Sequence, residues 1–250
     1  MKRAKLVPGF TLRRKKLSVI EIAERIIYFY KKLAELDANY DQVYVVAEKK
    51  ALHQSIKINA ENAQLQLSEE ILHQNAEEIQ KMDRVENPQV DFVMNKSIVS
   101  IGLQAKTHSD TLMTLNFSFL DSKNLKSSIG SIVTSEKCFE SLEKAKCFLD
   151  IARESFSVDH SVIKVFDREL NKTARSYKAP LGWITYFSND YEIPIPDDLE
   201  GIEYEYTDKG KYLILTRENI AKDEAKLEEA KQKLLKTMQE IADRVPEYKK

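Results

Sequence analysis

Two long segments of the chain repeat apolar residues at helical spacing. In the first, Ser18 and Glu21 carry the capping-box sequence "SVIE", and apolar residues then recur on one face as far as Leu36. In the last segment, Leu or Ile recurs every seven residues from Ile220 to Ile241. Shorter patterns add two further helices, one of them starting at Ser68. The patterns predict helices over about 18–36, 68–82, 136–156 and 221–244.

Strict alternation of apolar and polar residues predicts strands in the middle of the chain. It runs from Val99 to Ala105 and again from Met113 to Phe119, so each strand should have one face on the core and one towards water. Other strands are predicted at 5–14, 42–48, 90–94, 161–166 and 182–188, and at 201–206 and 211–216, which "DKG" joins into a hairpin.

This order of elements predicts an α+β fold. We expect a largely antiparallel sheet, or sheets, with amphipathic helices packed on one face. The chain is interpreted as a single domain over residues 1–250. The loop at 121–135 would allow two lobes, 1–120 and 136–250.

The composition is that of an ordinary globular protein. The chain has 250 residues, of which 42% are hydrophobic and 32% charged, and its net charge is −1. No apolar run is long enough for a membrane span, and the basic start "MKRAKLVPGFTLRRKK" lacks the apolar segment of a signal peptide. We interpret that start as a charged edge strand rather than a nucleic-acid-binding arm. Cys138 and Cys147 stand nine apart in one predicted helix, which favours two reduced thiols and a cytoplasmic protein.

The sequence holds no catalytic signature. It contains no glycine-rich phosphate loop, no GxSxG and no HExxH. The four histidines form no i, i+4 pair, so no metal site is indicated. We therefore expect no catalytic residues, no metal and no cofactor. The histidines are His53, His73, His108 and His160.

The most specific signal is an acidic segment from Asp190 to Asp208. It holds eight carboxylates and no Lys or Arg, although the whole chain is nearly neutral. Glu203 and Glu205 should share one face of a strand, with Tyr204 and Tyr206 on the other. The prolines of "IPIPDD" stiffen the preceding loop. The segment is either a solvated loop or a docking surface for a basic partner. Its candidate binding residues are Asp190, Tyr191, Glu192, Asp197, Asp198, Glu200, Glu203 and Glu205.

The stretch "GWITYFSNDYEIPIPDDLEG", followed by "GKYLILTREN" and an amphipathic helix, resembles the immunity protein 52 family of bacterial polymorphic-toxin systems. "YKKLAELDANYDQVYV" resembles that family's N-terminal helix, loop and strand, so the resemblance covers about 17–46 and 180–245. The family motif is Gly-Trp-(Leu/Met/Ile)-Thr-Tyr-hydrophobic-Ser. It matches Gly182, Trp183, Ile184, Thr185, Tyr186, Phe187 and Ser188 here, and we assign Gly182, Trp183, Thr185 and Tyr186 a structural role.

The resemblance implies a cytoplasmic, non-enzymatic protein that binds and neutralises a cognate toxin. Such toxins are usually predicted nucleases of restriction-endonuclease-like fold, delivered by contact-dependent systems such as type VI secretion. The acidic segment would then meet a basic nuclease groove. Neither nucleic acid nor membrane is an expected partner, and the oligomeric state is open. Two alternatives stand beside this hypothesis: a metal-dependent hydrolase using the 197–205 carboxylates (Asp197, Asp198, Glu203 and Glu205), and an adaptor module docking through the last helix.

Overall fold

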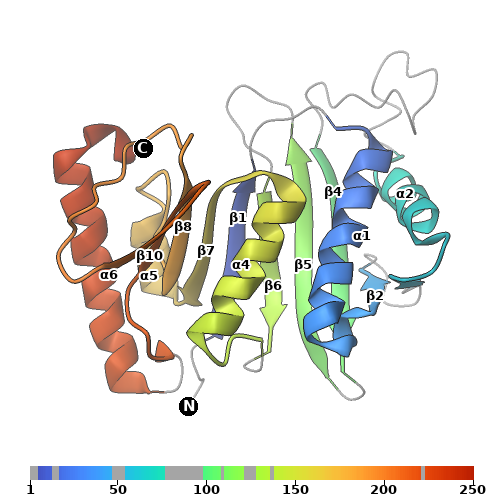
Figure 1. The fold of residues 1–250 in the computed structure, drawn as a ribbon, viewed down its shortest axis with the longest axis horizontal. Helices are drawn as coiled ribbons and strands as arrows, with labels where there is room; N and C mark the ends of the chain where they lie inside the picture. Colours follow the sequence, from blue (N-terminus) through green and yellow to red (C-terminus); the bar gives the residue numbers. More distant parts are fainter. Residues whose placement is uncertain are drawn as a thin grey trace. The chain divides into compact units, whose positions relative to one another are not determined.

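The computed structural model describes residues 5–12, 17–46, 54–76, 98–107, 110–120, 128–135, 138–220 and 223–250 (Figure 1). These residues contain ten strands and five α-helices. The strands are β1 (Lys5–Leu12), β2 (Gln42–Val45), β3 (Ser55–Lys57), β4 (Ile98–Lys106), β5 (Thr111–Leu120), β6 (Ser128–Thr134), β7 (Val158–Phe166), β8 (Ile184–Ser188), β9 (Glu203–Thr207) and β10 (Gly210–Ile214). The helices are α1 (Val19–Leu36), α2 (Ala63–Gln74), α4 (Leu142–Phe156), α5 (Arg168–Ala174) and α6 (Glu224–Arg244), with 3₁₀ turns η1 (Ala38–Tyr40) and η3 (Pro246–Tyr248).

The chain forms two compact units. Unit 1 comprises Met1–Phe10, Glu136–Leu149 and Val158–Lys250, and unit 2 comprises Thr11–Ser135 and Asp150–Ser157. In unit 2 the strand order is β3-β2-β4-β5-β6, and every neighbouring pair is antiparallel. In unit 1 the order is β1-β7-β8-β10-β9, and the pairs from β7 to β9 are antiparallel. The α+β class with a largely antiparallel sheet is therefore confirmed.

Unit 2 is built around helix α1. The predicted capping box is present, because Ser18 Oγ accepts from the N–H of Glu21 at 3.2 Å while the Glu21 carboxylate accepts from the N–H of Ser18 at 2.7 Å. In Figure 1, α1 lies along β4 and β5. Phe29 of α1 packs against Phe117 of β5 and Phe156, with ring centroids 6.3 and 5.4 Å away. The apolar face read from the sequence is thus buried as far as Leu33, whereas Leu36 at the end of the helix is exposed.

Helix α2 begins earlier than the sequence indicates. Ser68 is not its N-cap but lies inside the helix, with its hydroxyl donating to the carbonyl oxygen of Gln64. The true N-cap is Asn62, whose side chain makes no capping hydrogen bond, so the sequence carries no strong start signal there. The expected end at Met82, the expected strand at 90–94, and His53 and His108 lie outside the described residues.

Unit 1 is organised by strand β8. All five of its residues are buried, so both of its faces are covered. Trp183, just before β8, is 0% exposed, and its indole N–H donates to the carbonyl oxygen of Thr216 at 2.9 Å. A Cβ at Gly182 would lie 2.3 Å from the carbonyl oxygen of Ile163, so only glycine fits that close approach. The Gly182–Ser188 segment is therefore part of the buried interior of unit 1.

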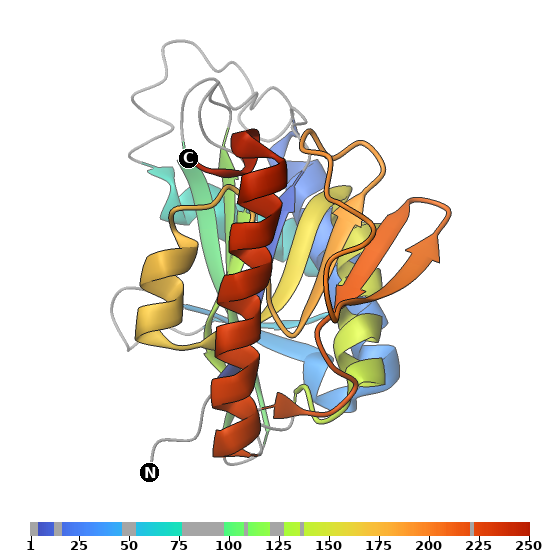
Figure 2. The ribbon, with the colours of Figure 1, turned by 90° about the vertical axis from the view of Figure 1, so that its left-hand side faces the viewer.

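Helix α6 packs into unit 1 with its apolar stripe. Asp223 caps it by accepting from the N–H groups of Ala225 and Lys226. Its buried residues include Leu234, Met238 and Ile241. Figure 2 shows α6 alongside α5, which it contacts. Among the described helices, none is long and apolar enough to cross a membrane.

Candidate functional site

The acidic segment leaves β8, forms a loop and then becomes β9. Tyr204 of β9 holds the loop, because its hydroxyl accepts from the N–H of Leu199 at 3.0 Å and donates to the carbonyl of Pro196 at 3.1 Å. Burial raises the pKa of Tyr204 to about 12, although the hydrogen bond from Leu199 opposes this shift. The loop is thus hydrogen-bonded to the strand that follows it.

Most carboxylates of this segment are paired with bases from elsewhere in unit 1. The negative charge is therefore largely compensated within the fold, and the segment is not the uncompensated negative surface that its sequence suggests. The hydrogen bond to Lys236 lowers the pKa of the exposed Glu200. The five pairs are Asp197–Lys211, Asp198–Arg244, Glu200–Lys236, Glu203–Arg217 and Glu205–Lys146.

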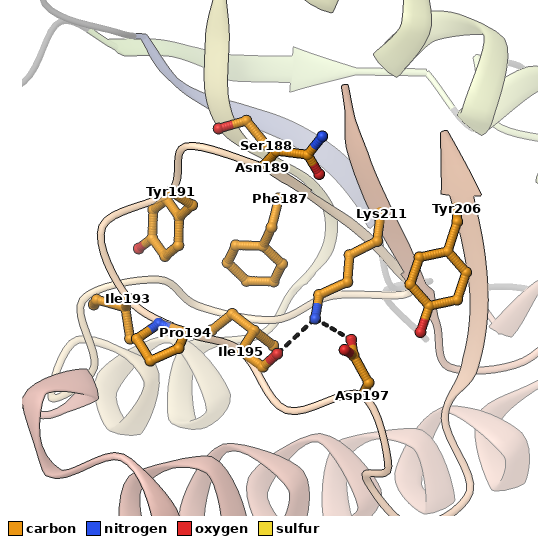
Figure 3. Close-up of a pocket in the computed structure, with 10 residues that line it drawn as sticks. All are labelled: Phe187, Ser188, Asn189, Tyr191, Ile193, Pro194, Ile195, Asp197, Tyr206 and Lys211. Carbon is orange, nitrogen blue, oxygen red and sulfur yellow. Dashed lines mark hydrogen bonds and ion pairs between the residues drawn. The ribbon is translucent and has the colours of Figure 1, made fainter. Parts of the chain in front are cut away.

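A pocket of about 250 Å³ opens beneath this loop in unit 1. In Figure 3 the ring of Phe187 lies between Tyr191 and the side chain of Lys211. The Lys211 ammonium donates to the carbonyl of Ile195 and pairs with Asp197. The lysine side chain is 17% exposed and the aspartate side chain 62%, so this pair reaches from the pocket to the surface. The lining residues are Phe187, Ser188, Asn189, Tyr191, Ile193, Pro194, Ile195, Asp197, Tyr206 and Lys211.

Aromatic packing makes one wall of the pocket rigid. The ring centroids of Phe187 and Tyr191 are 5.0 Å apart, and His160 stands 5.0 Å from Phe187. His160 is buried and its Nε2 lies 3.2 Å from the carbonyl oxygen of Pro180. Burial, and secondarily the charge of Glu192, raises the pKa of Tyr191, so its phenol stays protonated. This wall is preformed and does not need a ligand to assemble it.

The structure brings only part of the predicted site together. Tyr191 and Asp197 line the pocket, and Asp190 and Glu192 are exposed on the same loop. Two more acids are paired with α6: Asp198 with Arg244, and Glu200 with Lys236. Glu203 and Glu205 lie on the face of β9 opposite Tyr204 and Tyr206, as the alternation predicts.

Sequence reasoning missed Lys211 and Phe187 as pocket residues. Phe187 sits in an apolar run that looks like plain core. Lys211 is the second residue of β10, after Gly210, and only the pairing of β10 with β8 places it opposite Phe187. A lysine beginning a strand beside an acidic loop is the one local signal that pointed to it.

No metal centre is formed by the described part of the chain. No group of three His, Cys, Asp or Glu side chains there is arranged to hold an ion. The carboxylates of the hydrolase alternative are held by separate bases, Asp197 by Lys211 and Glu205 by Lys146. The adaptor alternative was docking through the last helix, α6, whose apolar stripe is buried within unit 1. Cys138 and Cys147 form no disulfide.

Comparison with known proteins gives a distant structural likeness. No protein-family model matches the chain, and neither does any curated protein. Among solved structures, the chain is similar to "Pseudomonas aeruginosa T6SS protein PA0821", with 10% sequence identity and a TM-score of 0.44, over 92% of this chain and 73% of that one. At that distance nothing transfers from that protein to this chain.

Proposed function

We propose that this protein is an immunity protein that binds and neutralises a cognate toxin through the pocket surface of unit 1. The observation that carries the proposal is the preformed pocket between Tyr191, Lys211 and Tyr206. Tyr206 at its border is 65% exposed, which is unusual for a large aromatic side chain. The resemblance of the Gly182–Ser188 motif to toxin-immunity proteins supports the same conclusion, because Phe187 and Ser188 of that motif line this pocket.

The physical basis is anchoring at low entropic cost. Protein interfaces draw most of their affinity from a few aromatic or Arg side chains seated in ordered pockets. Here the loop over the pocket is already fixed by Tyr204 and Lys211, so little ordering is required on binding. A large side chain of the toxin would enter beside Phe187, with Tyr191 and Tyr206 around it.

The proposed toxin is a nuclease of restriction-endonuclease-like fold, delivered by a contact-dependent or type VI secretion system. This protein would act in the cytoplasm, with no catalysis of its own. The surface ion pairs of the acidic segment are individually weak, because water and salt screen exposed charges. Lys and Arg side chains of a basic nuclease groove could therefore replace Arg244 or Lys236 as partners of Asp198 and Glu200.

The test is binding to the product of the neighbouring gene in catalytically inactive form. Tyr206→Ala should weaken the complex by about tenfold or more, measured by titration calorimetry. Tyr28→Ala is the matched control, because Tyr28 is 42% exposed on α1 of unit 2. Failure of the two proteins to associate would refute the proposal, and equal losses in the two variants would move the interface away from the pocket.

The absence of catalysis is tested separately. The purified protein should hydrolyse neither nucleotides nor nucleic acids above background with Mg²⁺, Mn²⁺ or Zn²⁺ present. Metal-dependent turnover that is lost in Asp197→Ala and Glu203→Ala would instead establish the hydrolase alternative.

A further inference from the structure

Strand β9 is the last strand of its sheet. The strand order of unit 1 ends β8-β10-β9, and within the described residues no strand pairs with the outer side of β9. The β9–β10 hairpin is the pair of orange strands in Figure 2. An uncovered end strand offers its main-chain groups to a partner strand.

The register shows which main-chain groups point outward. Antiparallel partners alternate between hydrogen-bonded and non-hydrogen-bonded pairs. The N–H of Asn189 donates to the carbonyl of Lys209, and the N–H of Leu215 donates to the carbonyl of Trp183. The main-chain N–H and C=O groups of every second residue from Lys209 to Leu215 therefore point towards β8. Gly210, Tyr212 and Ile214 consequently face β9.

Their partners on β9 are Thr207, Glu205 and Glu203, which turn their main-chain groups towards β10. Tyr204 and Tyr206 lie between these residues. Their N–H and C=O groups therefore point away from β10, along the outer edge. Two donors and two acceptors are thus arranged at strand spacing, as a pairing template requires.

The usual protection of such an edge is weak here. Natural sheets discourage edge pairing with uncompensated charges, prolines or bulges. β9 contains no proline, and its pairing with β10 is regular over all five residues. Its two charges, Glu203 and Glu205, are compensated by Arg217 and Lys146. The edge therefore lacks a repulsive row of charge.

The two faces of β9 define the chemistry of an incoming strand. Tyr204 and Tyr206 stack on one face, with ring centroids 6.3 Å apart and an interplanar angle of 17°. The opposite face carries the carboxylates of Glu203 and Glu205. Cross-strand neighbours on each face interact directly, so apolar or aromatic side chains suit the first face. The second face is already neutralised by Arg217 and Lys146, so uncharged side chains suit it.

The hairpin is also held in place before any partner arrives. The hydroxyl of Thr207 donates to the carbonyl of Gly210 at 3.1 Å and accepts from the N–H of Lys209 at 3.2 Å. Gly210 approaches β8 so closely that a Cβ would lie 2.1 Å from the carbonyl oxygen of Phe187. Such a fixed edge loses little entropy when another strand pairs with it.

We propose that β9 binds an extended segment of a partner protein by strand addition. The segment alternates apolar or aromatic residues with uncharged polar residues, so that the apolar ones lie beside Tyr204 and Tyr206 and the polar ones beside the neutralised Glu203 and Glu205. This inference does not depend on the partner being a toxin. The main-chain hydrogen bonds of the incoming segment form with the N–H and C=O groups of Tyr204 and Tyr206.

The test uses a phage-displayed library of random twelve-residue peptides, selected on the immobilised full chain. Enriched peptides should show apolar or aromatic residues at every second position, alternating with uncharged polar residues. Tyr206→Ala removes the ring but keeps the outward N–H, whereas Tyr206→Pro removes both. The Pro variant should bind an enriched synthetic peptide about tenfold more weakly than the Ala variant.

Lys57→Pro supplies the control, because it places a proline on β3, the end strand of unit 2. It should leave peptide binding unchanged. The inference is wrong if no peptide is enriched, or if the Pro and Ala variants bind the peptide equally.

Amide exchange on the wild-type chain gives a readout that needs no variant to fold. The amides of Tyr204 and Tyr206 should gain protection when the peptide binds, while those of Glu203 and Glu205 are already protected by pairing with β10. Unchanged exchange at both tyrosines would also overturn the proposal. Loss of toxin binding alone would refute the immunity function but leave this result standing.

Discussion

The indole N–H of Trp183 donates to the carbonyl oxygen of Thr216, which joins the residue before β8 to the second residue after β10. The ring is wholly buried, so it fills the interior of unit 1 as well as linking two segments. Trp183→Ala should lower the free energy of unfolding by about 3–5 kcal/mol, as other large-to-small core changes do. Urea denaturation followed by circular dichroism measures this. Trp183→Phe keeps most of the ring and should lose much less; near-wild-type stability of the Ala variant would contradict the structural role.

Lys211 should control the order of the loop above the pocket. Lys211→Met removes the donor to Ile195 and the partner of Asp197, leaving a carbonyl without its hydrogen bond. We expect a loss of about 1–2 kcal/mol in unfolding free energy and faster amide exchange in residues 190–198. Lys236→Met is the control, because its pair with Glu200 is exposed, and it should change neither quantity. Equal exchange rates in the two variants would show that Lys211 does not hold the loop.

Charge reversal of the loop should affect both binding and stability. Asp197→Lys with Asp198→Lys places like charges against Lys211 and Arg244. The double variant should associate more slowly with the toxin, and its melting temperature should fall because two internal pairs become repulsive. The wild-type association rate should fall as salt rises, since screening acts over about 8–10 Å at moderate ionic strength.

Reversal of Glu228 and Glu229 on α6 is the matched control for this double change, since both residues are exposed. Stopped-flow kinetics at low and high salt compares the three proteins. An unchanged association rate in the loop variant would show that the acidic segment takes no part in encounter.

Asp167 should make unit 1 sensitive to acid. Its side chain caps α5. The hydrogen bond from the N–H of Leu170 lowers the pKa of the Asp167 carboxyl most, and the hydrogen bond from Lys231 lowers it further. A group whose pKa is lowered by folding stabilises the folded state above its unfolded value of about 4, and that contribution is lost as pH falls through the folded pKa. Asp167→Asn keeps a capping oxygen but cannot titrate. Between pH 5 and 2, the melting temperature of this variant should therefore fall less than that of the wild type, by a difference on the order of a few degrees. Parallel pH profiles for the two proteins would argue against this linkage.

Local signals in the sequence located the elements that form independently of distant segments. Ser18 and Glu21 cap α1 within one turn, and the β4 and β5 alternation depends only on which face is buried. The start of α2 was misjudged because Ser68 has the chemistry of a cap but bonds back to Gln64 inside the helix. The ion partners of the acidic segment were not predictable, because Arg244 and Lys146 approach it only through the packing of α6 and α4.

The division of the chain sets the order in which the protein can be completed during synthesis. Unit 2 ends at Ser157, whereas unit 1 needs both Met1–Phe10 and Val158–Lys250. Segments that are synthesised first generally fold first. Lys236 and Arg244 emerge after the acids that they neutralise, so the loop over the pocket reaches its final form only when the last helix has left the ribosome. Nascent chains should consequently gain partner recognition only after α6 has been synthesised.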